Sequence, residues 1–248
     1  MANNWSRNQI LAALNLYFQI PSSRHDKNYL PIVKLAEIIG RSPGSLAMKL
    51  RNFTALDPSE QERGISGLPG GSRLDKEIWE SYYSDFSALA VDSEKALESF
   101  ALAPSVADEG YFEIQDTKAL VRVRRQQRFF RRVVLSSYGN SCAISSNPIP
   151  ELLIASHIKP WAIDRKNRAN PRNGICLAGT YDRAFDTGLI CISDEFKIQL
   201  SGKIEAFLPN EELTQMFLKF EGCELKLPDK NLPDKHLLEW HRTNIFRE

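Results

Sequence analysis

The segment that most constrains the fold of this chain runs from Ala155 to Ile190, "ASHIKPWAIDRKNRANPRNGICLAGTYDRAFDTGLI". It begins as an apolar stretch with His157 near its end, and Pro160 then prevents further ladder pairing because proline has no backbone N–H. A basic loop follows, then the apolar run "GICLAG", then a helical stretch that Gly188 ends. The sequence predicts strand, loop, strand and helix, with one of only four histidines at the first junction.

Basic residues are concentrated in the middle of the chain. From Lys118 to Arg183 there are 13 Lys or Arg and 3 Asp or Glu, a local balance of +10. The remainder carries 19 basic and 28 acidic residues, so the net charge of +1 hides this asymmetry. A basic centre flanked by acidic surface favours a polyanionic partner such as nucleic acid, and the alternative interpretation is a solvated basic face.

Length and composition exclude several protein classes. With 248 residues, 42% of them hydrophobic, the chain can form one or two domains with real cores. No apolar run reaches the roughly 20 residues of a membrane span, and without a secretory leader we expect a cytoplasmic protein. The cysteines form no close pair, so no structural zinc is expected. They are Cys142, Cys176, Cys191 and Cys223.

Three regions follow one another along the chain. Residues 1–103 have helical patterning and are expected to contact DNA or to form a homodimer. Residues 104–117 are small and acidic and include Pro104 and Gly110, which is typical of a linker. Residues 118–248 hold the basic centre. They end in a β-hairpin, "GLICIS" and "FKIQLS", and a helix, "DKHLLEWHRTNIF".

A helix-turn-helix is predicted in the first region. Ser6 is a good N-cap for the first helix, and Ser42 with Pro43 is a typical start for a later one. Two helices joined by a tight glycine turn can present the second helix to a DNA groove. Lys49 and Arg51 on that helix are the expected DNA contacts, although many helical hairpins are only packing units.

An arginine-rich helix precedes the central segment. From Gln126 the pattern gives one apolar and one basic face, and Gly139 ends it. The arginine fork donates two parallel hydrogen bonds, which suits phosphate. The expected phosphate contacts here are Arg124, Arg128 and Arg131.

The stretches "ASHIKPW", "NPRNGICL" and "DRAFDTGLI", after an entry "YGNSCAI", resemble the HNH endonuclease motif, the ββα-metal fold. They resemble the branch found in bacterial restriction-type HNH nucleases, and the resemblance covers roughly Phe129 to Leu200. The resemblance implies an α+β protein: a helical N-terminal domain, then an HNH nuclease domain with a β-hairpin and C-terminal helices.

Candidate catalytic residues lie on the two strands. His157 is the only histidine in the basic centre, and a neutral imidazole can accept a proton from water near pH 7. Asn173, which opens the second strand, is expected to orient that imidazole or to ligate a metal through its side-chain oxygen. Lys159, Arg172 and Arg183 are expected to grip the phosphate.

The metal ligands are expected on the helix, capped by Thr180. Asp182 and Asp186 are i,i+4 neighbours that share a face, and carboxylate oxygens suit Mg²⁺ or Mn²⁺. Ser156 and Tyr181 depart from the family: many relatives have Asp, Glu or His as a metal ligand at the first position and a histidine at the second. Tyr181 is a candidate phosphate or metal-site contact, or a core residue.

These observations predict a cytoplasmic, metal-dependent endonuclease that cleaves duplex DNA, with a role in restriction or defence. The resemblance implies products with 5′-phosphate and 3′-hydroxyl ends. Two alternatives remain: a non-catalytic DNA-binding protein on a degenerate HNH scaffold, and a helical protein whose basic segment meets an acidic partner.

Overall fold

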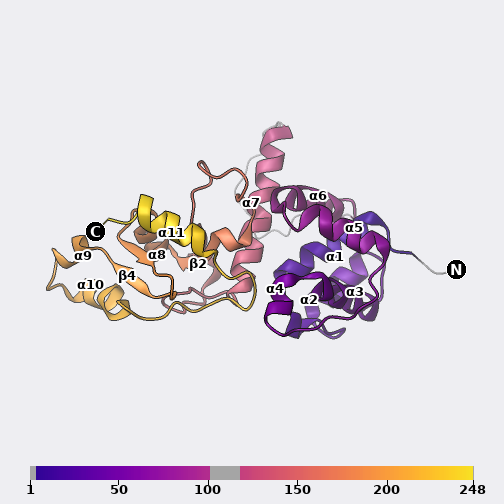
Figure 1. Ribbon diagram of the computed structural model, residues 1–248, viewed down its shortest axis with the longest axis horizontal. Coiled ribbons are helices and arrows are strands. Elements are labelled where there is room, and N and C mark those ends of the chain that lie inside the picture. The colour runs from indigo at the N-terminus through magenta and orange to yellow at the C-terminus, as the bar shows by residue number, and fades with distance from the viewer. Residues whose placement is uncertain (1–3, 101–117, 248) are drawn as a thin grey trace. The chain divides into compact units, whose positions relative to one another are not determined.

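The computed structural model of the chain describes residues 4–100 and 118–247 and divides into two compact units, with the boundary between Phe129 and Phe130 (Figure 1). The expected linker at 104–117 lies outside the described residues. The described chain is rich in helix and contains two small antiparallel hairpins. No helix in these ranges is long and apolar enough to cross a membrane.

Helix α1 is the centre of the first unit. Every residue from Ile10 to Phe18 is buried, and α1 contacts α2, α3, α5 and α6 (Figure 1). The helices of this unit are α1 (Arg7–Gln19), α2 (Leu30–Ile38), α3 (Pro43–Leu56), α4 (Pro58–Glu62), α5 (Arg73–Tyr82) and α6 (Phe86–Glu98). Helix α7 (Lys118–Ser137) contains the boundary between the two units.

Local sequence signals set the helix ends as predicted. The Ser6 hydroxyl accepts from the backbone N–H of Gln9, and the Ser42 hydroxyl accepts from Ser45, with Pro43 in the first turn. Each cap satisfies a donor that has no intrahelical partner. The expected caps of α1 and α3 are therefore confirmed.

The Lys49 side chain lies inside the first unit. Its ammonium is 2.7 Å from the Asp75 carboxylate, and both side chains are almost fully buried. The Trp5 ring covers the same ammonium at 4.8 Å. The expected DNA contact by Lys49 is corrected here, because its charge is paired within the protein. Arg51, by contrast, is an exposed residue whose Nε donates to the backbone carbonyl of His25.

The second unit contains a strand–loop–strand–helix segment and a second hairpin. Strand β1 pairs antiparallel with β2, with His157 opposite Gly174, and β3 pairs with β4. The predicted order is confirmed, but Ala178, not Thr180, is the N-cap residue of α8, and it caps without a side-chain hydrogen bond. The elements are β1 (Leu153–His157), β2 (Gly174–Ala178), α8 (Gly179–Asp186), β3 (Ile190–Ile192), β4 (Ile198–Leu200), α9 (Gly202–Glu205), α10 (Glu211–Met216) and α11 (Lys235–Asn244).

Helix α11 closes over the end of α8. The buried His241 ring stacks on Phe185 with a centroid distance of 3.7 Å, and its Nε2 donates to the Phe185 carbonyl at 3.0 Å. Gly188, which ends α8, has no room for a side chain, because a Cβ would lie 2.0 Å from the Ile245 carbonyl. Burial lowers the pKa of His241 to about 4.

The first prediction concerns the buried ion pair. Lys49→Met leaves the Asp75 carboxylate buried without its cation, so we expect a loss of about 3–5 kcal/mol in the unfolding free energy of the first unit. Lys49→Met/Asp75→Asn should recover most of this loss. The control is Glu77→Ala, which breaks the exposed Arg73–Glu77 pair on the same helix and should change stability little. Denaturant unfolding measures all three, and a small loss in Lys49→Met would contradict the prediction.

The second prediction concerns pH. Because the pKa of His241 is depressed in the folded state, its contribution is complete above the unfolded value of about 6.5 and is lost as pH falls toward 4. The loss should total about 3 kcal/mol. His241→Phe should remove this part of the pH dependence of unfolding. His236→Phe, at an exposed position of the same helix, should retain it; equal slopes in the two variants would exclude His241 as the source.

Candidate functional site

The end of β1 is held tightly against α7. A Cβ at Gly174, the partner of His157 in the ladder, would lie 2.5 Å from Val134 and 2.8 Å from Phe130. Only glycine allows this close approach of β2 to the helix. The first residue of β2 therefore brings the hairpin, and His157 with it, onto the apolar face of α7.

The His157 imidazole has a fixed orientation. Its ring is stacked on Phe130 with centroids 3.8 Å apart, and Trp161 meets its edge at 5.7 Å. Its Nε2 lies 2.9 Å from the backbone carbonyl of Arg168. A carbonyl only accepts, so Nε2 carries the hydrogen and Nδ1 keeps the lone pair of the neutral ring. Burial lowers the pKa of His157, and the Arg168 hydrogen bond opposes this effect in part.

The Asn173 side chain holds the loop between the strands. It is fully buried, its Oδ1 accepts from the Lys159 backbone N–H at 2.8 Å, and its Nδ2 donates to the carbonyls of Lys159 and Asn167. The expected direct contact of its oxygen with the imidazole or a metal is corrected, because the amide is fully buried and both of its ends bond to the loop backbone. Asn173 acts on His157 indirectly, through the loop that carries the Arg168 carbonyl.

Asp182 and Asp186 lie on α8 beside the end of β1. Burial raises the pKa of Asp182, which the Ser156 hydroxyl and Arg183 partly oppose. Burial and the charge of Asp182 raise the pKa of Asp186, which Arg183 again opposes. Each carboxylate thus lies where a nearby cation would stabilise its charged form.

A buried hydroxyl lies beside Asp182. Ser156 is 2% exposed, and its oxygen makes no hydrogen bond of normal geometry among the described residues, although it lies close enough to Asp182 to favour the charged carboxylate. Because neighbouring residues of a strand point to opposite faces, Ser156 and His157 lie on different sides of the hairpin. Within residues 4–100 and 118–247, no three His, Cys, Asp or Glu side chains gather in one cluster. Two neighbouring carboxylates of α8, one of them beside a buried hydroxyl, still fit a hard cation that keeps several waters.

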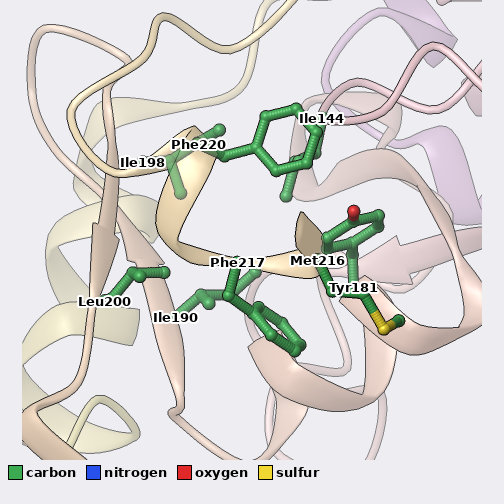
Figure 2. Close-up of a pocket in the computed structure, with 8 residues that line it drawn as sticks. All are labelled: Ile144, Tyr181, Ile190, Ile198, Leu200, Met216, Phe217 and Phe220. Carbon is green, nitrogen blue, oxygen red and sulfur yellow. The ribbon is translucent and has the colours of Figure 1, made fainter. Parts of the chain in front are cut away.

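Tyr181 is a core residue of the second unit. Its ring lies edge-on to Phe217 and Phe220, with centroid distances of 5.9 and 5.8 Å. Figure 2 shows these rings around an apolar recess that has no space for a water molecule. Burial raises the pKa of Tyr181. The expected phosphate or metal-site contact is therefore corrected in favour of packing.

Lys159 and Arg172 form ion pairs within the second unit. The Lys159 ammonium lies 3.5 Å from the Asp164 carboxylate and faces the Trp240 ring at 5.1 Å. The Arg172 guanidinium lies 3.8 Å from the Asp234 carboxylate. The first pair lies within the loop after β1, and the second joins the end of that loop to the N-terminus of α11, so each of these cations already has an acidic partner in this structure.

The arginines of α7 and α8 differ in their surroundings. Arg131 donates to the Leu153 carbonyl at 2.9 Å and so ties α7 to the start of β1, and a phosphate contact through its remaining N–H donors stays a prediction. Arg183 is exposed on α8 beside the two carboxylates. Arg124 and Arg128 are half-buried on α7.

Sequence reasoning overlooked two contributors to the site. The Arg168 carbonyl that orients His157 carries no sequence signal, because any residue has a backbone carbonyl. Asp164, however, accepts from the backbone N–H groups of Lys166 and Asn167. An Asp at the start of a polar turn commonly accepts such backbone hydrogen bonds, so the stretch "DRKN" could have indicated an ordered turn.

Comparison with known families identifies the segment that holds this site. Residues 142–193 match the family model HNH_2, described as HNH endonuclease. The matched segment contains β1, the basic loop, β2, α8 and β3, and with them His157, Ser156 and both carboxylates. Comparison with curated proteins gives no match. The match supports an HNH endonuclease domain at residues 142–193, in the C-terminal half of the chain.

Proposed function

We propose that the chain is a metal-dependent endonuclease that hydrolyses phosphodiester bonds of duplex DNA, with His157 as general base. The observation that carries the proposal is the orientation of the imidazole within the HNH segment. Its Nε2–H is bound to a carbonyl, burial favours the neutral ring by lowering its pKa, and Nδ1 retains a lone pair for a proton.

The proposed reaction needs three contributions. Nδ1 of His157 accepts the proton of a water whose oxygen attacks the phosphorus. The bond from phosphorus to the 3′-oxygen breaks, and that oxygen takes a proton from solvent, which leaves 5′-phosphate and 3′-hydroxyl ends. We propose that Arg183, which is exposed on α8, binds the phosphate and neutralises part of its negative charge.

Asp182 and Asp186 would hold the metal, with the Ser156 hydroxyl as a partner for a water of hydration. Ser156 and His157 face opposite sides of the hairpin, but His157 is the last residue of β1, so the scissile phosphate would have to lie at this end of the hairpin, within reach of both sides. Mg²⁺ or Mn²⁺ bound there would neutralise charge on the phosphate and stabilise the leaving oxygen. Carboxylate and hydroxyl oxygens are the donor set that these hard cations prefer.

The wider assignments rest on the sequence. We propose that the protein acts in the cytoplasm, in restriction or defence against foreign DNA, and that residues 1–103 contribute DNA contacts or a homodimer interface. The remaining candidates for contacts with the DNA backbone outside the HNH segment are Arg51, Arg124, Arg128 and Arg131.

The experiment that tests the central proposal is incubation of plasmid DNA with the full chain in Mg²⁺, Mn²⁺ or EDTA. Binding without cleavage in either metal would favour a DNA-binding protein on a degenerate scaffold.

The third prediction is that His157→Ala lowers the cleavage rate by about 10²- to 10⁴-fold, because it removes the general base. DNA affinity measured in EDTA should remain, since phosphate contacts dominate it. The matched control is His236→Ala, which removes an exposed histidine of the same unit and should cleave like the wild type. An alanine variant at 157 that cleaves at nearly the wild-type rate would exclude His157 from the reaction.

The fourth prediction concerns the metal. Asp182→Asn and Asp186→Asn should each raise the Mg²⁺ concentration for half-maximal cleavage at least about tenfold, because each removes a charged oxygen ligand. Mn²⁺ affinity measured by titration calorimetry should fall in parallel, which separates binding from catalysis. Glu205→Gln, an exposed acid of α9, is the control. If neither aspartate variant changes Mn²⁺ affinity, the metal ligands lie elsewhere.

A further inference from the structure

The loop between β1 and β2 is ordered by its own side chains. The Asp164 carboxylate accepts from the backbone of Lys166 at 3.2 Å and of Asn167 at 3.1 Å, and from the Asn167 amide at 2.9 Å. The Arg168 guanidinium donates to the Trp161 carbonyl at 2.8 Å and faces the Trp161 ring. These contacts hold the loop in one conformation.

The tip of this loop, Ile163 to Lys166, combines exposed apolar and cationic side chains. Ile163 is 57% exposed, although an isoleucine normally gains by burial. Arg165 and Lys166 are exposed and form no ion pair within the described residues. Lys159, in the same loop, is already paired with Asp164.

The loop tip is also connected to the catalytic candidate. Arg168, two residues beyond Lys166, supplies the carbonyl that accepts a hydrogen bond from Nε2 of His157. The Trp161 ring packs against the same imidazole in a T-shaped arrangement. A duplex whose phosphate reaches His157 must therefore pass close to this loop. A surface for duplex DNA needs cations for the phosphates, and an apolar side chain beside them can enter a groove.

We propose that the loop tip is a DNA-contact element in which Arg165 and Lys166 each neutralise one phosphate and Ile163 packs into the adjoining groove. This inference rests on the proposed function and deepens it, because it moves the phosphate contacts from Lys159 and Arg172 to two residues with free cationic groups.

The test uses the full chain in EDTA with a short DNA duplex, and measures the dissociation constant over a range of salt concentrations. Arg165→Ala/Lys166→Ala should reduce the slope of log affinity against log salt by about 1.8, because each phosphate that is no longer neutralised removes about 0.9 from the slope. The matched control is Lys197→Ala/Lys203→Ala, which removes two exposed lysines of the same unit and should keep the wild-type slope.

Ile163→Ala separates the apolar contact from the charges. We expect affinity to fall about tenfold at every salt concentration with an unchanged slope, because burial of an apolar side chain does not involve counterions. Leu218→Ala, an exposed apolar residue outside the loop, should bind as the wild type does.

The outcomes distinguish this inference from the proposed function. An unchanged slope in the double variant, with wild-type plasmid cleavage in Mg²⁺, overturns the loop assignment alone and leaves an acidic protein surface as the partner of Arg165 and Lys166. An unchanged affinity in Ile163→Ala overturns the groove contact. Absence of duplex binding and cleavage by the wild type overturns both the inference and the proposed function.

Discussion

The second unit depends on one buried amide. Asn173 is fully enclosed, and both ends of its side chain are bonded to the backbone of the loop that joins β1 to β2. A buried amide without partners would cost about 1–3 kcal/mol, so this geometry is strongly favoured. Because the loop also carries the Arg168 carbonyl, the amide fixes the orientation of His157 without touching it. The order of the candidate site follows from this arrangement.

Burial acts on the acidic and basic groups of the site in opposite directions. It lowers the pKa of His157 and raises the pKa of Asp182 and Asp186, and in each case it disfavours the charged form. For a general base this is useful, because a neutral imidazole is the form that accepts a proton. For the carboxylates, burial disfavours the charged form, and Arg183 offsets this effect only in part. A divalent ion bound to both carboxylates would stabilise their charged forms further.

Some cations of the basic centre stabilise the fold and others are available to a polyanion, and composition alone does not separate the two groups. Arg131 bonds to the Leu153 carbonyl, Lys159 and Arg172 form ion pairs, and all three hold the second unit together. In the first unit Lys49 is likewise paired with a buried carboxylate. A count of Lys and Arg along the chain includes these structural cations together with those available to a polyanion. Only their partners in the folded protein tell them apart.

Local sequence patterns were enough to predict the order of strands and helices, several helix caps, and the place of His157, because these depend on hydrophobic periodicity, on proline and glycine, and on side-chain oxygens near helix ends. They also predicted that Asp182 and Asp186 share a face, since i,i+4 spacing is fixed by the helix. The folded chain was needed to see that Asn173 binds the loop backbone, that Tyr181 packs against Phe217 and Phe220, and that Lys49 is enclosed. These outcomes depend on residues far apart in the chain, and no local pattern specifies which distant group satisfies a buried polar atom.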